Sequence, residues 1–260
     1  MARNAKAIAL LGGRNLVKSF RTPMLVTASV LQPVIWLVMF SQTFRGLADT
    51  PQFRTLGFDS YLTFFAPGMV VLSVLFTALQ SGMATITDID TGMMDKFLIS
   101  PIRRSSILVG RIAADALTML VQGALVLVLA TLMGARIRSG FGGAVGILVL
   151  ATLFGVVWAS LSNLIALRTR NSELTMVSGL FLTLPALFLT SAFFPMQFLP
   201  SWLSDVAKAN PAAYVIESGQ RFMLGTNDWG QDGRALLALG IAAVVLVPAA
   251  VTAFRRTTEG

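Results

Sequence analysis

Cysteine and histidine are both absent from the 260 residues of this chain. Their absence excludes disulfide bonds, metal sites built on thiolate or imidazole ligands, a cysteine nucleophile and a Ser-His-Asp triad. The pattern G-x-x-x-x-G-K-[ST] is also missing, so the chain has no Walker A loop of its own with which to bind ATP. We therefore expect no catalytic residue, metal or cofactor in this chain, and no enzyme activity of its own.

Charge is scarce as well. Charged residues make up 12% of the chain and hydrophobic residues 55%, whereas a soluble domain carries about 25% charged residues. A bilayer core about 30 Å thick needs roughly 20 apolar residues in a helix. Stretches of this length, with Asp115 their only charged residue, predict an all-α integral membrane domain spanning 1–260, with six transmembrane helices at 24–44, 61–86, 113–135, 142–167, 174–194 and 235–254.

The basic residues predict the orientation of these spans. With both ends of the chain inside, the inner segments hold 13 Lys and Arg and the outer segments 7. This bias predicts cytoplasmic termini, because Lys and Arg concentrate on the cytoplasmic side. Residues 1–22, with five basic and no acidic side chains, are expected to form an amphipathic helix on the inner leaflet; a loosely ordered basic tail is the alternative. No basic patch interleaved with aromatics predicts a nucleic-acid partner.

The cytoplasmic segment 88–104 exceeds the length of a plain connection. Met93, Met94, Phe97 and Leu98 form one apolar stripe of a short helix, which Pro101 ends. Charged residues surround the stripe: Asp88, Asp90, Asp95, Lys96, Arg103 and Arg104. A soluble partner could bury this stripe, or the segment could be a turn that touches only lipid headgroups.

The external segment 195–234 is also long, and its pattern predicts two short helices separated by Asn210 and Pro211. Trp202 lies on the apolar face of the first helix. In the second, Glu217 precedes Arg221 by four residues, the favourable order for an ion pair. The helices are expected to rest at the outer surface or dip into the outer leaflet; an ordinary interfacial cap anchored by Trp202 is the alternative.

Three polar residues within the spans are candidate functional residues, because polar groups are costly in a bilayer. Asp115 is expected to pair with Arg111, one turn earlier, at the cytoplasmic edge; a role in translocation is the alternative. Gln122 and Asn163 are expected to form hydrogen bonds between helices.

The order of these features resembles the ABC-2 type permeases, and most closely the branch of daunorubicin and doxorubicin resistance exporters. The resemblance covers roughly residues 14–224. The matching motifs are Phe20-Arg21-Thr22-Pro23, Gln32-Pro33, Phe65-Ala66-Pro67-Gly68, Asp90-Thr91-Gly92, Leu98-Ile99-Ser100-Pro101, Ile107-Leu108-Val109-Gly110-Arg111, Pro200-x-Trp202-Leu203, Asn210-Pro211 and Arg221. Asp90 departs from the usual Glu, and Met93 from the common Thr.

The resemblance implies a permease in a bacterial cytoplasmic membrane, paired with a second permease protomer, identical or different, and with two ATP-binding subunits that bind ATP and Mg²⁺. It implies export of a hydrophobic or amphipathic substrate such as a drug or lipid, or alternatively of a lipid-linked glycan. Residues 88–104 would form a coupling helix on the ATPase, through Asp90, Gly92, Met94, Phe97, Leu98, Pro101, Arg103 and Arg104.

The external helices would line the exit in such a permease, through Trp202, Asn210, Pro211, Glu217 and Arg221. Two other classes remain open: an ion-coupled secondary transporter and a membrane assembly protein that transports nothing. The absence of charge in the span cores disfavours the first, and the structured cytoplasmic loop weakly disfavours the second.

Overall fold

The computed structural model describes residues 23–93, 104–198, 200–208, 210–226 and 228–259. The predicted inner-leaflet helix at 1–22 and most of the predicted coupling helix lie outside the described residues. Every regular element in the described part of the chain is helical, which confirms the all-α prediction. These elements are α2 (Pro23–Thr43), η1 (Arg45–Asp49), α3 (Pro51–Arg54), α4 (Tyr61–Asp90), α6 (Arg104–Leu132), α7 (Gly140–Thr169), α8 (Ser172–Phe188), η2 (Met196–Phe198), α9 (Ser201–Ala207), α10 (Pro211–Leu224) and α11 (Trp229–Glu259).

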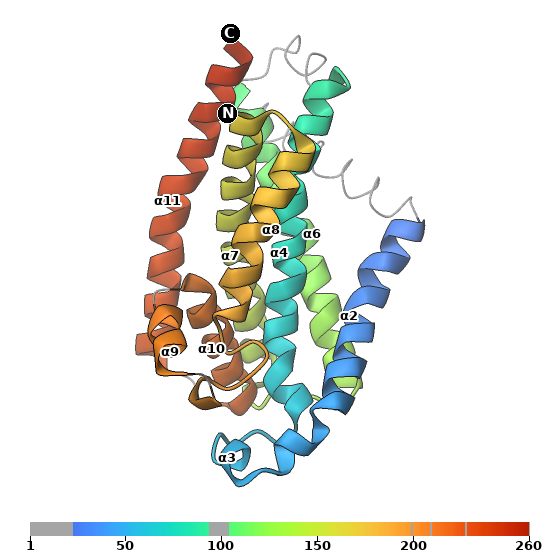
Figure 1. Ribbon diagram of the computed structural model, residues 1–260, viewed down its shortest axis with the longest axis vertical. Coiled ribbons are helices and arrows are strands. Elements are labelled where there is room, and N and C mark those ends of the chain that lie inside the picture. Colours follow the sequence, from blue (N-terminus) through green and yellow to red (C-terminus); the bar gives the residue numbers. More distant parts are fainter. Residues whose placement is uncertain (1–22, 94–103, 199, 209, 227, 260) are drawn as a thin grey trace.

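Within the described residues, the long helices α2, α4, α6, α7, α8 and α11 run alternately up and down the long axis of the molecule (Figure 1). The junction of α7 with α8 and the end of α11 lie toward the upper end, and α2 starts near mid-height. Helices α9 and α10 lie in the lower half, and α3 is lowest. Within the described residues, four helices are long and apolar enough to cross a membrane: Tyr61–Asp90, Ile107–Leu132, Gly140–Thr169 and Gly230–Arg255. Helix α8 is apolar but shorter, with 17 residues.

Helix α4 forms the centre of the bundle. It packs against α2, α6, α7, α8 and α10, and nearly all of its side chains from Tyr61 to Leu75 are buried. A helix segment that is almost wholly apolar, as α4 is from Tyr61 to Leu75, is expected at such a position. Small residues permit close packing: a Cβ on Gly82 would lie 2.5 Å from the carbonyl oxygen of Ser162 on α7.

Helix α2 contacts the bundle mainly through aromatic rings near its lower end. Phe40 stacks on Phe65 of α4 with ring centroids 5.1 Å apart, and Phe44 lies 5.3 Å from Tyr61. Toward its upper end α2 diverges from the other helices (Figure 1). The part of α2 that packs is therefore the part nearest α3 and η1.

The prediction of one continuous helix over 174–194 is wrong. Helix α8 ends at Phe188, residues 189–193 form turns, and a bend follows at Phe194. Pro185 lies one turn before this end, where its ring removes the N–H that would bond to the carbonyl four residues earlier. The apolar character of the sequence continues beyond this point although the helix does not.

Candidate functional site

The helices that flank residues 94–103 end and begin at the same end of the bundle (Figure 1). Helix α4 ends at Asp90, which is exposed, and Gly92 follows in the left-handed region with φ +65°. Helix α6 begins at Arg104. The other coupling residues predicted from the sequence lie outside the described residues: Met94, Phe97, Leu98, Pro101 and Arg103. The coupling helix therefore stays a prediction.

A polar stripe runs along α4 toward this segment. Thr77, Ser81, Thr85 and Asp88 are spaced by four, four and three residues, which places them on one face of the helix. Each of these side chains forms a hydrogen bond with a side chain of another helix. We call the stripe and its partners Arg111, Asp115, Gln122 and Asn163 the inner polar network.

Asn163 lies at the centre of this network and is completely buried. Its side-chain amide nitrogen donates to Ser81 Oγ at 2.9 Å, and its oxygen accepts from Thr85 Oγ1 at 2.6 Å. Ser81 in turn donates to Asp115 Oδ2 at 2.5 Å. Nearer the middle of the bundle, Thr77 donates to Gln122 Oε1. The network thus joins α4, α6 and α7 by side-chain hydrogen bonds.

Arg111 does not form its ion pair with Asp115, contrary to the prediction. Its Nη1 lies 2.5 Å from Asp88 Oδ2 on α4, and both side chains are partly buried. The spacing along α6 would permit Arg111 to pair with Asp115. On α4, however, the carboxylate of Asp88 binds the Arg111 guanidinium, and the hydroxyl of Ser81 donates to Asp115. Arg111 and Asp115 of α6 therefore both bind α4.

The lower half of the bundle in Figure 1 brings several sequence motifs together. Pro67 and Gly68 of α4 lie beneath both α10 and the turn that follows α8. A Cβ on Gly219 would lie 2.7 Å from Pro67 Cβ, and a Cβ on Gly68 would lie 3.0 Å from the carbonyl oxygen of Ala192. These close approaches explain the small residues at both glycine positions.

Asn210 and Pro211 begin α10 as the sequence indicates. Asn210 caps the helix by accepting a hydrogen bond from the Ala212 N–H at 3.0 Å, and Pro211 occupies the first turn, where its missing N–H costs nothing. The Asn210 side-chain nitrogen also donates to the carbonyl oxygens of Ala186 and Leu189. One side chain therefore links the start of α10 to the end of α8.

The expected ion pair between Glu217 and Arg221 is not found among the described residues. Arg221 binds Asp232 of α11, with Nη2 2.6 Å from Oδ1. Glu217 is half-buried, and burial raises the pKa of its carboxyl group, while the charge of Arg221 lowers it less. Asp232 is better placed for Arg221 because the chain turns at Gly225, with φ +74°, and brings the first turn of α11 beside the last turn of α10.

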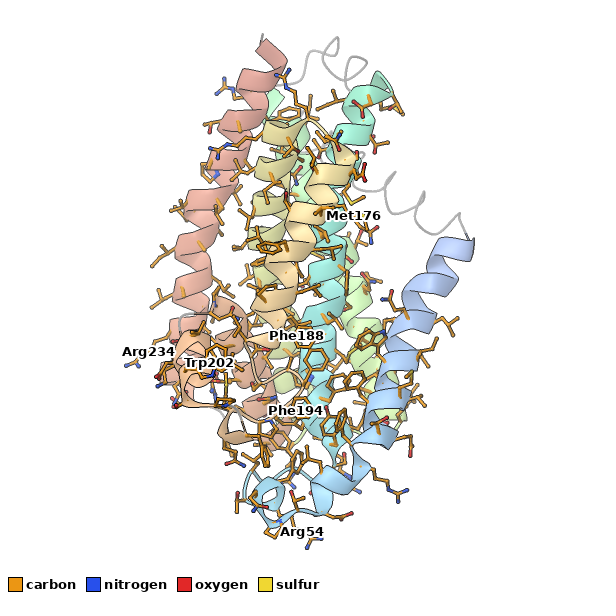
Figure 2. All side chains as sticks on the ribbon, viewed as in Figure 1. Arg54, Met176, Phe188, Phe194, Trp202 and Arg234 are labelled. Atoms are coloured by element: carbon orange, nitrogen blue, oxygen red, sulfur yellow. The ribbon has the colours of Figure 1, made fainter. Side chains whose placement is uncertain are left out.

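Trp202 of α9 lies at the molecular surface, with 66% of its area exposed. Figure 2 shows it in the lower half of the molecule, as it shows Phe188 and Phe194, which flank the turn after α8. Trp202 is thus separate from the buried contacts that Asn210 and Arg221 make. It presents its ring outward, as an interfacial anchor would.

Sequence reasoning missed Tyr61, Ser81, Asp88, Gln220 and Asp232 as candidate site residues. The spacing of Ser81 and Asp88 within the α4 stripe could have identified them. Gln220 and Asp232 carry no such local signal, because their partners lie on other elements. Within the described part of the chain, no group of His, Cys, Asp and Glu could hold a metal ion.

Comparison with known proteins adds an independent observation. Residues 6–224 match the profile of the ABC-2 type transporter family. The chain is 29% identical to the daunorubicin resistance ABC transporter permease protein DrrB1 of Streptomyces coeruleorubidus, over 90% of this chain and 80% of that protein. It is 29% identical to the putative transport permease ycf38 of Porphyra purpurea, over 83% and 73% respectively. It is 23% identical to the probable doxorubicin resistance ABC transporter permease protein DrrC of Mycobacterium tuberculosis, over 95% and 87%.

Proposed function

The chain belongs to the ABC-2 type transporter family, and we propose that it is a permease subunit that exports a hydrophobic or amphipathic substrate with energy from ATP hydrolysed by a separate subunit. The missing Walker A pattern supports the separate ATPase. The names of the daunorubicin and doxorubicin resistance relatives support a drug-like substrate. The active complex would contain two ATPase subunits, which bind ATP and Mg²⁺, and a second permease protomer.

Six spans with cytoplasmic termini are part of this proposal. The alternating course of the six long helices supports an even number of crossings (Figure 1), and the distribution of Lys and Arg supports the orientation. Helix α8 alone is roughly 26 Å long at about 1.5 Å per residue, slightly short of a bilayer core. The buried turn after α8 would complete this crossing. The membrane would be a bacterial cytoplasmic membrane.

The observation that best supports coupling to an ATPase is the inner polar network. It begins with Asp88 and Arg111, close to the two helix ends that residues 94–103 join, and continues inward to Gln122. A force applied to this segment would reach α4, α6 and α7 together, because hydrogen bonds tie these helices. ATP can shift the transport equilibrium only through contacts that differ between its states, and residues 90–104 would provide them.

The decisive experiment replaces Phe97 and Leu98 by glutamate. We expect the variant to insert normally, to bind the ATPase weakly and to lose ATP-driven export from inverted vesicles. Leu132→Glu with Phe141→Glu is the matched control, because these apolar residues are well exposed near the opposite end of the bundle. Normal export by the Phe97 and Leu98 variant would contradict the docking assignment. Export by the unmodified protein that persists without ATP would favour an ion-coupled transporter.

A further inference from the structure

Arg111 of α6 has two carboxylates within reach, one on a neighbouring helix and one on its own. It binds Asp88 of α4, with Nη1 2.5 Å from Oδ2. Asp115 follows Arg111 by four residues on α6, a spacing at which two side chains of one helix meet. The base precedes the acid, which is the less favourable order for such a pair. The observed preference of Arg111 for Asp88 agrees with this order, and Asp115 is the weaker alternative.

The carboxylate of Asp115 has no cationic partner among the described residues. The one side chain of the described residues that donates to it is Ser81, whose hydroxyl lies 2.5 Å from Oδ2. A carboxylate within a membrane-spanning helix is costly, and such residues usually pair with another group. An uncharged amide would accept the same hydrogen bond from Ser81 at a lower cost. The hydroxyl alone therefore does not explain why this position carries a charge.

The guanidinium of Arg111 is also incompletely bound. Its Nε is buried and has no hydrogen-bond partner among the described residues, and 16% of its side chain is exposed. A buried donor without an acceptor costs free energy. Asp115 is the carboxylate one turn away on the same helix, and a rotation of the Arg111 side chain toward it would give the guanidinium a second acceptor. Two incompletely satisfied groups of opposite charge thus lie one turn apart on α6.

The position of Asp88 near the end of α4 makes its bond to Arg111 the first to break if α4 tilts. Nearly all side chains of α4 over residues 61–75 are buried, and Thr77 is joined to α6 by a hydrogen bond. At about 1.5 Å per residue, Asp88 lies roughly 16 Å beyond Thr77 along the helix and Ser81 roughly 6 Å. A tilt of the end of α4 away from α6 about Thr77 would therefore displace Asp88 about three times as far as Ser81.

We propose that Arg111 exchanges its carboxylate partner during the transport cycle: it binds Asp88 while the ends of α4 and α6 joined by residues 94–103 are together, and Asp115 when they separate. This assignment rests on the proposed export function. Asp115 is the positioning residue that keeps the guanidinium paired in the separated state. Without it, separation would leave a largely buried charge unpaired, which is strongly destabilising. Asp115 therefore lowers the free energy of the separated state and makes the movement possible.

The first test asks whether the two carboxylates replace one another as partners of Arg111. Asp88→Asn, Asp115→Asn and the double variant are unfolded reversibly as full chains in mixed micelles. Each single variant leaves Arg111 one carboxylate, whereas the double variant leaves it none. We expect the unfolding equilibrium constant of the double variant to exceed the product of the two single fold-changes by about tenfold or more. Fold-changes that simply multiply would overturn the exchange.

The second test separates this role from a structural one. Asp115→Asn keeps an acceptor for the Ser81 hydroxyl and leaves the pair of Arg111 with Asp88 intact, so the protein should fold and bind the ATPase normally. ATP-driven export by the complete complex in inverted vesicles should nevertheless fall about tenfold or more, because the separated state loses its ion pair. Asp115→Glu restores a carboxylate on the same face and should restore most of the export. Thr118→Val is the matched control on α6, since the Thr118 hydroxyl bonds only within its own helix, and it should export normally.

Normal export by Asp115→Asn would overturn the assignment. Equal losses of export in Asp115→Asn and Asp115→Glu would also overturn it, because the charge at this position would then have no part in transport. The unfolding measurements need neither ATPase nor substrate, so they keep the two proposals apart. If the unmodified protein exports with ATP while the fold-changes of Asp88→Asn and Asp115→Asn multiply, the exchange fails and the proposed function stands. If the unmodified protein exports nothing with ATP, the proposed function fails, and the role of the exchange in transport fails with it.

Discussion

Arg221 donates from two guanidinium nitrogens to one carboxylate oxygen of Asp232, at 2.6 and 3.2 Å. The Asp232 side chain is 4% exposed and that of Arg221 19%. The pair joins the last turn of α10 to the first turn of α11, and Arg221 also donates to Ser218 on its own helix. A charge-assisted contact of this kind fixes the angle between two helices as well as their distance.

Removing one partner of this pair should be strongly destabilising, because the other charge then stays buried without compensation. We expect Asp232→Ala to lower the free energy of unfolding by about 3–5 kcal/mol, measured by reversible unfolding in mixed micelles. Combining Asp232→Leu with Arg221→Met should cost less than either charge-removing single change. The exposed pair of Asp205 and Lys208 is the control, where Asp205→Ala should have no measurable effect. Additive losses in the double variant would show that the pair is not coupled.

Local spacing predicted the helices better than it predicted their contacts. The apolar runs place α4 and α7 almost where they lie, since a membrane helix satisfies its own backbone and needs only length and hydrophobicity. Ion pairs were predicted between residues four apart, Arg111 with Asp115 and Glu217 with Arg221. In both cases a carboxylate from another helix binds the arginine instead. Spacing along one helix cannot show what its neighbour presents.

The non-helical turn after α8, residues 189–195, could not be predicted for a related reason. The apolar run continues through residue 194, and Pro185 alone does not end a transmembrane helix, because neighbouring groups can satisfy the freed carbonyls. Here the donors are Tyr61, Asn210 and Gln220, which are distant in the sequence. No local sequence signal distinguishes these three residues from their neighbours. Only the tertiary arrangement shows that they bind the carbonyl groups beyond the end of α8.

Asn163 provides a test of the inner polar network. We expect Asn163→Leu, which keeps the size of the side chain, to cost about 1–3 kcal/mol because Thr85 and Ser81 lose a buried partner. ATP hydrolysis by the complex should persist while export falls, since α7 would no longer follow α4 and α6. Ser160→Ala is the control: its hydroxyl bonds only within its own helix, to the Val156 carbonyl oxygen. If export and ATP hydrolysis fell in parallel, the network would have no specific part in coupling.

Gly82 should be the glycine of α4 that is least tolerant of a side chain. A Cβ there would approach the Ser162 backbone at 2.5–2.7 Å, and backbone in a packed helix cannot yield. We expect Gly82→Ala to cost about 1–3 kcal/mol by forcing α4 from α7, measured as the loss of unfolding free energy. Gly240→Ala on α11 meets nothing within 4 Å. It should be neutral or stabilise the protein by up to about 1 kcal/mol through helix propensity. Equal costs at both sites would contradict the close packing of α4 on α7.

Glu217 should make the stability of the protein depend on pH. Burial raises the pKa of its carboxyl group above the ordinary value of 4.5, so the folded state binds its proton more tightly than the unfolded chain does. Well below pH 4.5 the group is protonated in both states and costs nothing. As the pH rises through 4.5 toward the raised pKa, the unfolded chain loses the proton first, and the folded state loses stability.

Glu217→Gln removes this titration and keeps the shape of the side chain. The variant should equal the parent protein in stability at the acidic end and exceed it at neutral pH, and the difference should grow only between pH 4.5 and the raised pKa. Thermal unfolding of both proteins over the same pH series measures the difference in stability between them. The contributions of all other titrating groups cancel in this difference. Tyr214→Phe on the same helix leaves every carboxyl group in place and should show a constant offset. A Glu217→Gln variant that is less stable than the parent at neutral pH would mean that the carboxylate is stabilised by Arg221 more than it is penalised by burial.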